Sequence, residues 1–134
     1  MATMFNFELV SPERKVISEE AFQVTIPGEE GMVGVRAGHM ALVVSVRPGV
    51  VEVIRKEGGE VERIFIAGGF ADISAEHCTV LAEEAVPVYA LNAEKLEAEL
   101  ARLNEELGFA DTADEKAKLS RRVAIVTAMM DAVR

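Results

Sequence analysis

The sequence contains little cysteine, few aromatic residues and no long hydrophobic run. Cys78 is the single cysteine among 134 residues, which excludes an internal disulfide framework and fits a reducing compartment. Tryptophan is absent and aromatic residues make up 5% of the chain, so a core must be built from aliphatic side chains and methionine. No apolar run approaches the roughly 20 residues that span a bilayer, and the first residues lack the pattern of a secretory signal. We therefore expect a soluble, cytosolic chain that does not insert into a membrane.

Positive charge is also scarce. The chain has 14 lysine and arginine residues against 23 aspartate and glutamate residues, which gives a formal net charge of −9. A charge of this sign argues against nucleic acid and against an anionic lipid surface as partners. Half of the residues are hydrophobic, which is enough for one ordinary domain or two small ones.

The first two thirds of the chain show a repeat of two. All but one of the ten glycines and all four prolines precede residue 90. Phe5, Phe7 and Leu9 alternate with other residues, as do Phe22, Val24 and Ile26, which is the pattern of half-buried strands. Short strands with turn signals every 8–12 residues or so are typical of an all-β sandwich. We predict an antiparallel β-sandwich over residues 1–89.

Glycines mark the turns of this predicted sandwich. Gly58 and Gly59 stand between two strand-like runs and predict a hairpin. Replacement of Gly38 or Gly69 by valine should damage the fold if either position needs a positive φ, because glycine is the default residue for that conformation.

From residue 90 to residue 134 the apolar spacing becomes helical. Leucines recur at intervals of four and three, and a second stripe follows with the same intervals, which places each stripe on one helix face. The two stripes are Leu96, Leu100, Leu103 and Leu107, then Leu119, Val123, Val126, Met130 and Val133. We predict an antiparallel hairpin of two helices.

The expected ends of these helices carry capping residues. Asn92 is a good N-cap for the first helix, and Gly108 is a natural residue to follow its last turn. Thr112 and Glu115 have the spacing of a capping box at the start of the second helix.

Catalytic and metal-binding chemistry finds little support. His77 and Cys78 are adjacent, so on a strand their side chains point to opposite faces, and we expect His77 to be exposed and Cys78 to be buried. No second cysteine or third histidine is present to complete a zinc site. Gly28–Gly34 lacks the lysine of a phosphate-binding loop. An enzyme that uses His77 and Cys78 stays as an alternative, but we expect no catalytic residue, metal or cofactor.

The most specific feature is the glycine-rich stretch between Ile26 and Val53. Its glycines, a histidine and a Pro-Gly pair have the spacing G-x-x-G-x-x-x-G-H, with Pro48-Gly49 nine residues further on. Its apolar residues fit either a core or a surface that meets a partner. As candidate partner-binding residues we take Gly28, Glu29, Glu30, Gly31, Met32, Val33, Gly34, Gly38, His39, Met40 and Leu42.

This stretch resembles the epsilon subunit family of bacterial F-type ATP synthase, and the likeness extends over essentially the whole chain. The matching segments are Phe7–Pro12, Val24–Pro27, Gly31–His39, Pro48-Gly49, Ile66–Phe70 and Val80–Glu83. The resemblance implies a β-sandwich that binds the gamma subunit and the ring of c subunits, followed by a helical hairpin with a regulatory role. It further implies a non-catalytic subunit of the central stalk, which couples proton-driven rotation to ATP synthesis. Such a subunit is one monomer within a hetero-oligomeric complex, peripheral to the cytoplasmic side of the inner membrane.

The resemblance also suggests roles for the hairpin. In the family it can inhibit ATP hydrolysis through basic residues that meet the alpha and beta catalytic subunits, and the candidates here are Lys116, Lys118, Arg121 and Arg122. Some members bind ATP through an Asp-x-x-Arg-Ala motif at the start of the first helix. Here Asn92 and Lys95 replace the acid and the arginine. Lysine cannot replace a bidentate arginine, so a nucleotide-sensing module is the weaker alternative.

Overall fold

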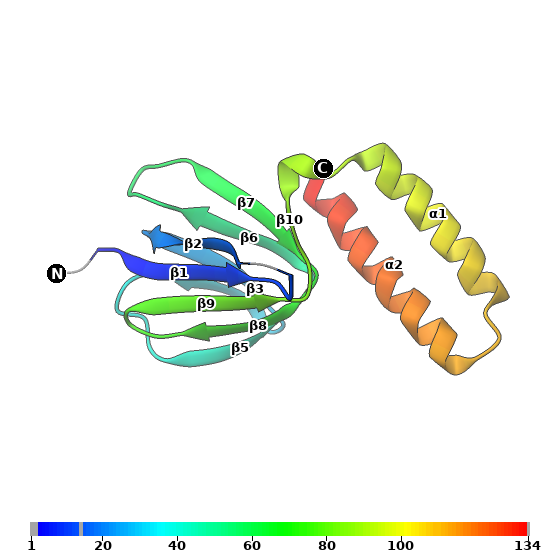
Figure 1. Ribbon diagram of the computed structural model, residues 1–134, viewed down its shortest axis with the longest axis horizontal. Coiled ribbons are helices and arrows are strands. Elements are labelled where there is room, and N and C mark those ends of the chain that lie inside the picture. Colours follow the sequence, from blue (N-terminus) through cyan, green and yellow to red (C-terminus); the bar gives the residue numbers. More distant parts are fainter. Residues whose placement is uncertain (1–2, 14, 134) are drawn as a thin grey trace. The chain divides into compact units, whose positions relative to one another are not determined.

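The computed structural model describes residues 3–13 and 15–133 of the chain. Within those residues it contains ten strands, one short 3-10 helix and two α-helices (Figure 1). The chain divides into two compact units, residues 1–87 and residues 88–134. The strands are β1 (Phe5–Val10), β2 (Lys15–Ala21), β3 (Gln23–Gly28), β4 (Gly31–Val35), β5 (Leu42–Val46), β6 (Gly49–Ile54), β7 (Val61–Ile66), β8 (Gly69–Ile73), β9 (His77–Ala82) and β10 (Ala85–Pro87).

The first unit is a β-sandwich, as the sequence predicts. Its strands follow the order β10-β7-β6-β3-β5-β8-β9-β1-β2, and β4 pairs with β3. Strand β3 belongs to both layers of the sandwich. Its first residues pair with β6 in one layer, and its last residue, Gly28, pairs with β5 in the other. Every pairing among the described strands is antiparallel except that of β1 with β9, which is parallel. The sequence does not predict this parallel pair, because alternating apolar residues give the same pattern whether two paired strands run parallel or antiparallel.

The core of the sandwich comes from the inward residues of the strands. Phe5, Phe7 and Leu9 are all buried, which confirms the alternation predicted for β1. The prediction for Phe22 is wrong, because this residue lies at a bend between β2 and β3 and is only half-buried. The Arg36 guanidinium lies 4.8 Å from the centroid of its ring, so Phe22 contributes a cation–π contact.

Gly38 and Gly69 both have the positive φ that is the condition for damage by valine. Gly38 has a φ of 87° and Gly69 a φ of 148°. A Cβ at Gly69 would overlap the carbonyl oxygen of Leu81 on the neighbouring strand β9. Gly58 also has a positive φ, at 74°, in the predicted hairpin between β6 and β7.

The second unit begins with η1 (Val88–Ala90) and continues with α1 (Ala93–Phe109) and α2 (Ala113–Val133). The Asn92 side chain accepts a hydrogen bond from the Lys95 amide at 3.1 Å, which confirms the N-cap. The Thr112 hydroxyl oxygen accepts one from the Glu115 amide at 3.1 Å, which is the first half of the predicted capping box.

The predicted end of α1 is wrong by two residues. The helix continues through Gly108 to Phe109, and Gly108 has no positive φ. Ala110 ends it in an extended conformation, and its amide donates to the Leu107 carbonyl at 3.4 Å. Gly108 does not adopt the left-handed conformation that often ends a helix. The chain instead leaves α1 in an extended conformation at Ala110, before the Thr112 cap.

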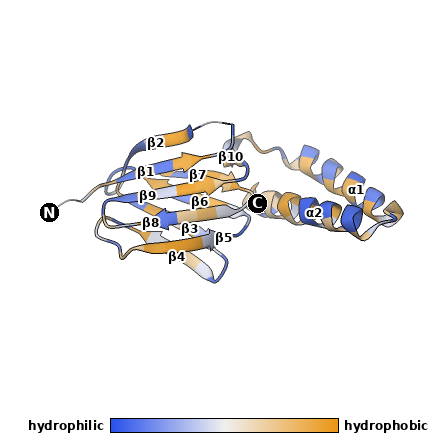
Figure 2. Ribbon diagram, turned by 60° about the horizontal axis from the view of Figure 1, so that its bottom comes forward, coloured by the Kyte–Doolittle hydropathy of each residue, from blue (hydrophilic) through white to orange (hydrophobic). Residues whose placement is uncertain are grey.

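The two helices form the predicted hairpin. Figure 2 shows hydrophobic and hydrophilic residues on different sides of both helices. Leu96 and Leu103 are buried, and the Arg122 Nε donates to the Glu99 carboxylate across the two helices at 3.1 Å. Helix α2 also buries a second stripe that the sequence analysis missed, consisting of Ile125, Met129 and Ala132.

Candidate functional site

The predicted site begins in the hairpin of β3 and β4. Gly28 and Gly31 are opposite each other, so Glu29 and Glu30 form a two-residue turn between them. Both glutamates are exposed, and Gly31 has a φ of 140°. Gly28 is buried, because its backbone lies against the Gly31 carbonyl and the Val44 side chain. The glycine-rich stretch therefore contains a strand, β4, directly after this turn.

The tip of this hairpin and strand β5 line one groove of about 430 Å³. Figure 2 shows the β3–β4 turn at one margin of the strands. The structure thus brings together seven of the predicted residues, from Gly28 to Val33 and Leu42. It adds three that the prediction omits. The added lining residues are Val43, Val44 and Ser45.

Apolar side chains are exposed around this groove. Met32 is 52% exposed, Leu42 44% and Val43 70%. Val33 is only partly buried and packs against the core. Of the two readings of this stretch, core or partner surface, the exposed side chains fit the second.

A second group of predicted residues lies just before β5. The loop before β5 contains Gly38, His39 and Met40, and the Gly38 amide donates to the Ala75 carbonyl in the β8–β9 turn at 2.8 Å. The His39 Nδ1 lies 2.6 Å from the Met40 carbonyl oxygen, and the Met40 side chain is 82% exposed. The predicted residues therefore form two groups, the groove lining, which includes Leu42 at the start of β5, and the loop of Gly38, His39 and Met40 just before it; Gly34, on β4, lies in neither.

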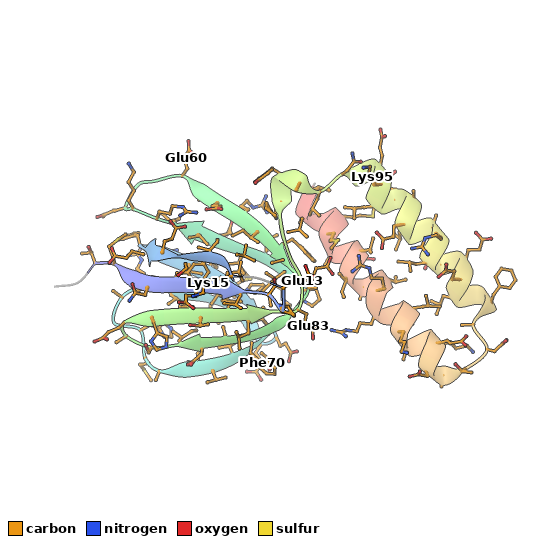
Figure 3. The ribbon with its side chains drawn as sticks, viewed as in Figure 1. Glu13, Lys15, Glu60, Phe70, Glu83 and Lys95 are labelled. Atoms are coloured by element: carbon orange, nitrogen blue, oxygen red, sulfur yellow. The ribbon has the colours of Figure 1, made fainter. Side chains whose placement is uncertain are left out.

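Two further exposed apolar residues extend the surface along the sheet. Phe70 on β8 is 57% exposed and Leu81 on β9 is 54% exposed, and the two are register partners. Figure 3 labels Phe70, which extends from the outer side of the strands. Phe70 and Leu81 each stand next to a buried residue, Ala71 and Val80. The alternation along a strand could therefore have predicted from the sequence that they are exposed.

The pair of His77 and Cys78 has the predicted arrangement. His77 is exposed, and its Nδ1 lies 2.7 Å from the Ser74 hydroxyl in the β8–β9 turn. Cys78 is fully buried. Burial, with a smaller effect of the nearby Asp72 carboxylate, raises the pKa of the Cys78 thiol from 9.0 to about 12. The two side chains do not converge, and a thiol of this pKa is a poor nucleophile.

The four basic candidates of α2 do not share one face of the helix. Arg122 pairs with Glu99 of α1, and Lys118 lies one turn earlier with its Nζ 3.5 Å from Asp114. Lys116 is about 200° from Lys118 around the helix axis. Lys116, Lys118 and Arg121 are exposed, whereas Arg122 is half-buried.

Other kinds of site are not found in the described part of the chain. Residues 3–13 and 15–133 contain no group of three or more histidine, cysteine or acidic side chains placed to hold a metal ion. None of the helices described has the length and apolar character required to cross a membrane.

Known proteins resemble this chain over most of its length. The model of the ATP synthase delta/epsilon chain beta-sandwich domain matches residues 4–88. The ATP synthase epsilon chain of Paramagnetospirillum magneticum is 42% identical over 134 residues, which cover 99% of both chains. That of Sinorhizobium medicae is 44% identical over 133 residues, which cover 99% of this chain and 98% of the relative.

Solved structures agree with these relatives. A chain in the mitochondrial ATP synthase of Euglena gracilis superposes with a TM-score of 0.86 at 25% identity, covering 100% of this chain and 84% of that one. A chain in the central stalk and c-ring of the Tetrahymena thermophila enzyme gives a TM-score of 0.63 at 13% identity, covering 97% and 96%, and supports the fold. The match to the domain model, together with full-length identity above 40%, shows that the chain belongs to the ATP synthase epsilon chain family.

Proposed function

We propose that this chain is a non-catalytic rotor subunit, which transmits rotation of the c-ring to the catalytic head of ATP synthase. The observation that carries the proposal is the exposed surface at the β3–β4 tip and along β5. There Met32, Leu42 and Val43 are exposed although they are apolar. Such a surface is typical of a site for protein partners.

The partners that fit this role are the gamma subunit and the c-ring. Two solved structures similar to this chain belong to ATP synthase complexes, and one of them is of a central stalk and c-ring. With these partners the chain is peripheral to the membrane, on the cytoplasmic side of the inner membrane. Transmission of torque requires a stiff body, and a sandwich with pairing across both layers supplies one.

Cysteine cross-linking tests this proposal. The native Cys78 is buried with a raised pKa, so a cysteine placed at Glu29 or Met32 becomes the reactive thiol. We expect both variants to form cross-links to the gamma subunit or the c subunit in assembled membranes. A cysteine at Glu60, exposed in the β6–β7 loop, is the matched control. No cross-link from the tip, or equal cross-linking from Glu60, contradicts the proposal.

For the helical unit we propose a regulatory contact with the alpha and beta subunits. The observation in favour is that Lys116, Lys118 and Arg121 are exposed on α2 of a chain whose net charge is −9. Their replacement by glutamine should raise ATP hydrolysis by the assembled complex while the sandwich still binds. Unchanged hydrolysis excludes the regulatory contact and leaves the rotor role intact.

A further inference from the structure

Two strands beside β3, namely β4 and β5, each have backbone that no described strand fully covers, and neither carries a charged residue. Proteins usually protect an open edge with charges, proline or a very short strand. Strand β2 contains Lys15, Glu19 and Glu20, and β10 has three residues and ends at Pro87. Strands β4 and β5, with the sequences GMVGV and LVVSV, contain no charged residue. The usual protection is therefore missing on one side of the sandwich.

The hydrogen bonds around β5 show which backbone groups lie on its open edge. The Glu29 amide donates to the Ser45 carbonyl at 3.0 Å, and the Arg47 amide donates to the Pro27 carbonyl at 3.0 Å. Ser45 and Arg47 therefore direct their backbone groups towards β3. Because these directions alternate along a strand, Val43 points its N–H and C=O the same way. However, β5 pairs with β3 only through Val46 and Gly28, so no described strand pairs with Val43 on that side.

The lining of the groove next to this edge is acidic, and the Arg47 guanidinium borders it at 3.4 Å from the Met32 sulfur. Among its lining residues only Glu29 and Glu30 are charged, and both are acidic. The remaining lining residues are glycine, methionine, leucine, valine and serine. A segment that fills the groove would therefore combine apolar side chains with a lysine or arginine near the turn.

We propose that the open edge of β5 binds an extended segment of a partner subunit as an added strand. The segment pairs with the backbone of Val43, and its basic residue lies beside Glu29 and Glu30. Only an extended chain satisfies a strand's N–H and C=O together, which is why we favour it over a docked helix. This inference rests on the proposed function and specifies how the partner is bound at that site.

Residue-resolved amide exchange tests the added strand. The probe is the complete ATP synthase complex assembled with this chain, compared with the free chain. We expect the Val43 amide to exchange at least about tenfold more slowly in the complex, as one new hydrogen bond predicts. The Val44 amide is the matched control, because it already faces β8 and should be slow in both states.

Two substitutions at one position separate the backbone from the side chain. Val43→Pro removes the N–H, whereas Val43→Thr keeps the N–H and the β-branched shape. We expect about tenfold weaker assembly for the proline variant and little change for the threonine variant. Thermal unfolding of both free variants shows whether the sandwich remains intact. If the proline variant does not fold, the exchange measurement on the unaltered chain still tests the added strand.

The possible outcomes distinguish this inference from the proposed function. Assembly with cross-links from Met32 but without protection of Val43 overturns the added strand and leaves the rotor role. Failure of the unaltered chain to enter the complex overturns both. Replacement of Glu29 and Glu30 by glutamine should also reduce the salt dependence of assembly, and an unchanged salt dependence overturns the basic residue assigned to the segment.

Discussion

At the scale of single residues, Cys78 connects burial to pH dependence. Its thiol is fully buried on β9, where the charged form is poorly solvated, so the pKa rises from 9.0 to about 12. The unfolded thiol ionises above pH 9, whereas the folded thiol keeps its proton. The stabilising contribution is therefore complete below pH 9 and is lost as the pH rises towards 12.

This difference gives a measurable slope. Between pH 9 and pH 12 the free energy of unfolding should fall by about 1.4 kcal/mol per pH unit more in the native chain than in Cys78→Ala. Urea unfolding from pH 8 to pH 11 measures the free energy of unfolding of both chains. The comparison with the alanine variant removes the contributions of lysine and tyrosine titration, which the two chains share. Equal slopes would show that the thiol is not buried in solution.

Gly69 is the second residue with a sharp prediction. Its φ of 148° and the carbonyl of Leu81 leave no room for a Cβ. Gly69→Ala should lower the free energy of unfolding by at least about 2 kcal/mol. Gly34→Ala is the control, because a Cβ at Gly34 has no atom within 4 Å, and its effect should stay within about 0.5 kcal/mol. Similar losses in the two variants would contradict the steric argument.

At the scale of elements, one ion pair links α1 to α2. Glu99 and Arg122 have side chains 29% and 35% exposed, whereas the pair of Asp114 and Lys118 on α2 is 82% and 78% exposed. A double-mutant cycle should give about 0.5–1 kcal/mol of coupling for the first pair and near zero for the second. Coupling that persists unchanged in 1 M salt would show that the interaction is not electrostatic.

The elements also show how far the sequence predicts this fold. The burial of Phe5, Phe7 and Leu9 and the cap at Asn92 follow from local rules, because each depends on neighbouring residues alone. The end of α1 does not follow from local rules. Gly108 predicts a helix that ends at Leu107, whereas the helix continues to Phe109 and the chain becomes extended at Ala110. The parallel pairing of β1 with β9 depends on residues about seventy positions apart, and no local pattern contains it.

The candidate site was predictable in part for the same reason. The sequence places Glu29 and Glu30 in a glycine-rich turn but leaves Met32 open between core and partner surface, and the structure has all three exposed. The addition of Val43 to the groove requires knowledge that β5 leaves β3 after Gly28 and pairs with β8 instead. The separation of His39 from the tip likewise depends on the strand between them.

At the scale of the whole molecule, the chain consists of two units with separate cores. The unit of residues 1–87 contains all ten described strands and its own buried cluster. Deletion of residues 88–134 should therefore leave a sandwich that unfolds cooperatively and still forms the Met32 cross-link. Circular dichroism during thermal unfolding and the cross-linking assay measure the two expectations. A truncated chain without a cooperative transition would show that the helical unit is required for folding.

The pairing of Phe7 with Cys78 has a consequence for biosynthesis. Strand β1 leaves the ribosome first, yet one of its two neighbours is among the last strands of its unit to be made. Contacts of such large sequence separation slow folding, because a long loop must close before they form. The sandwich therefore cannot complete its folding before β9 has been made, and until then β2 is the one native neighbour available to β1.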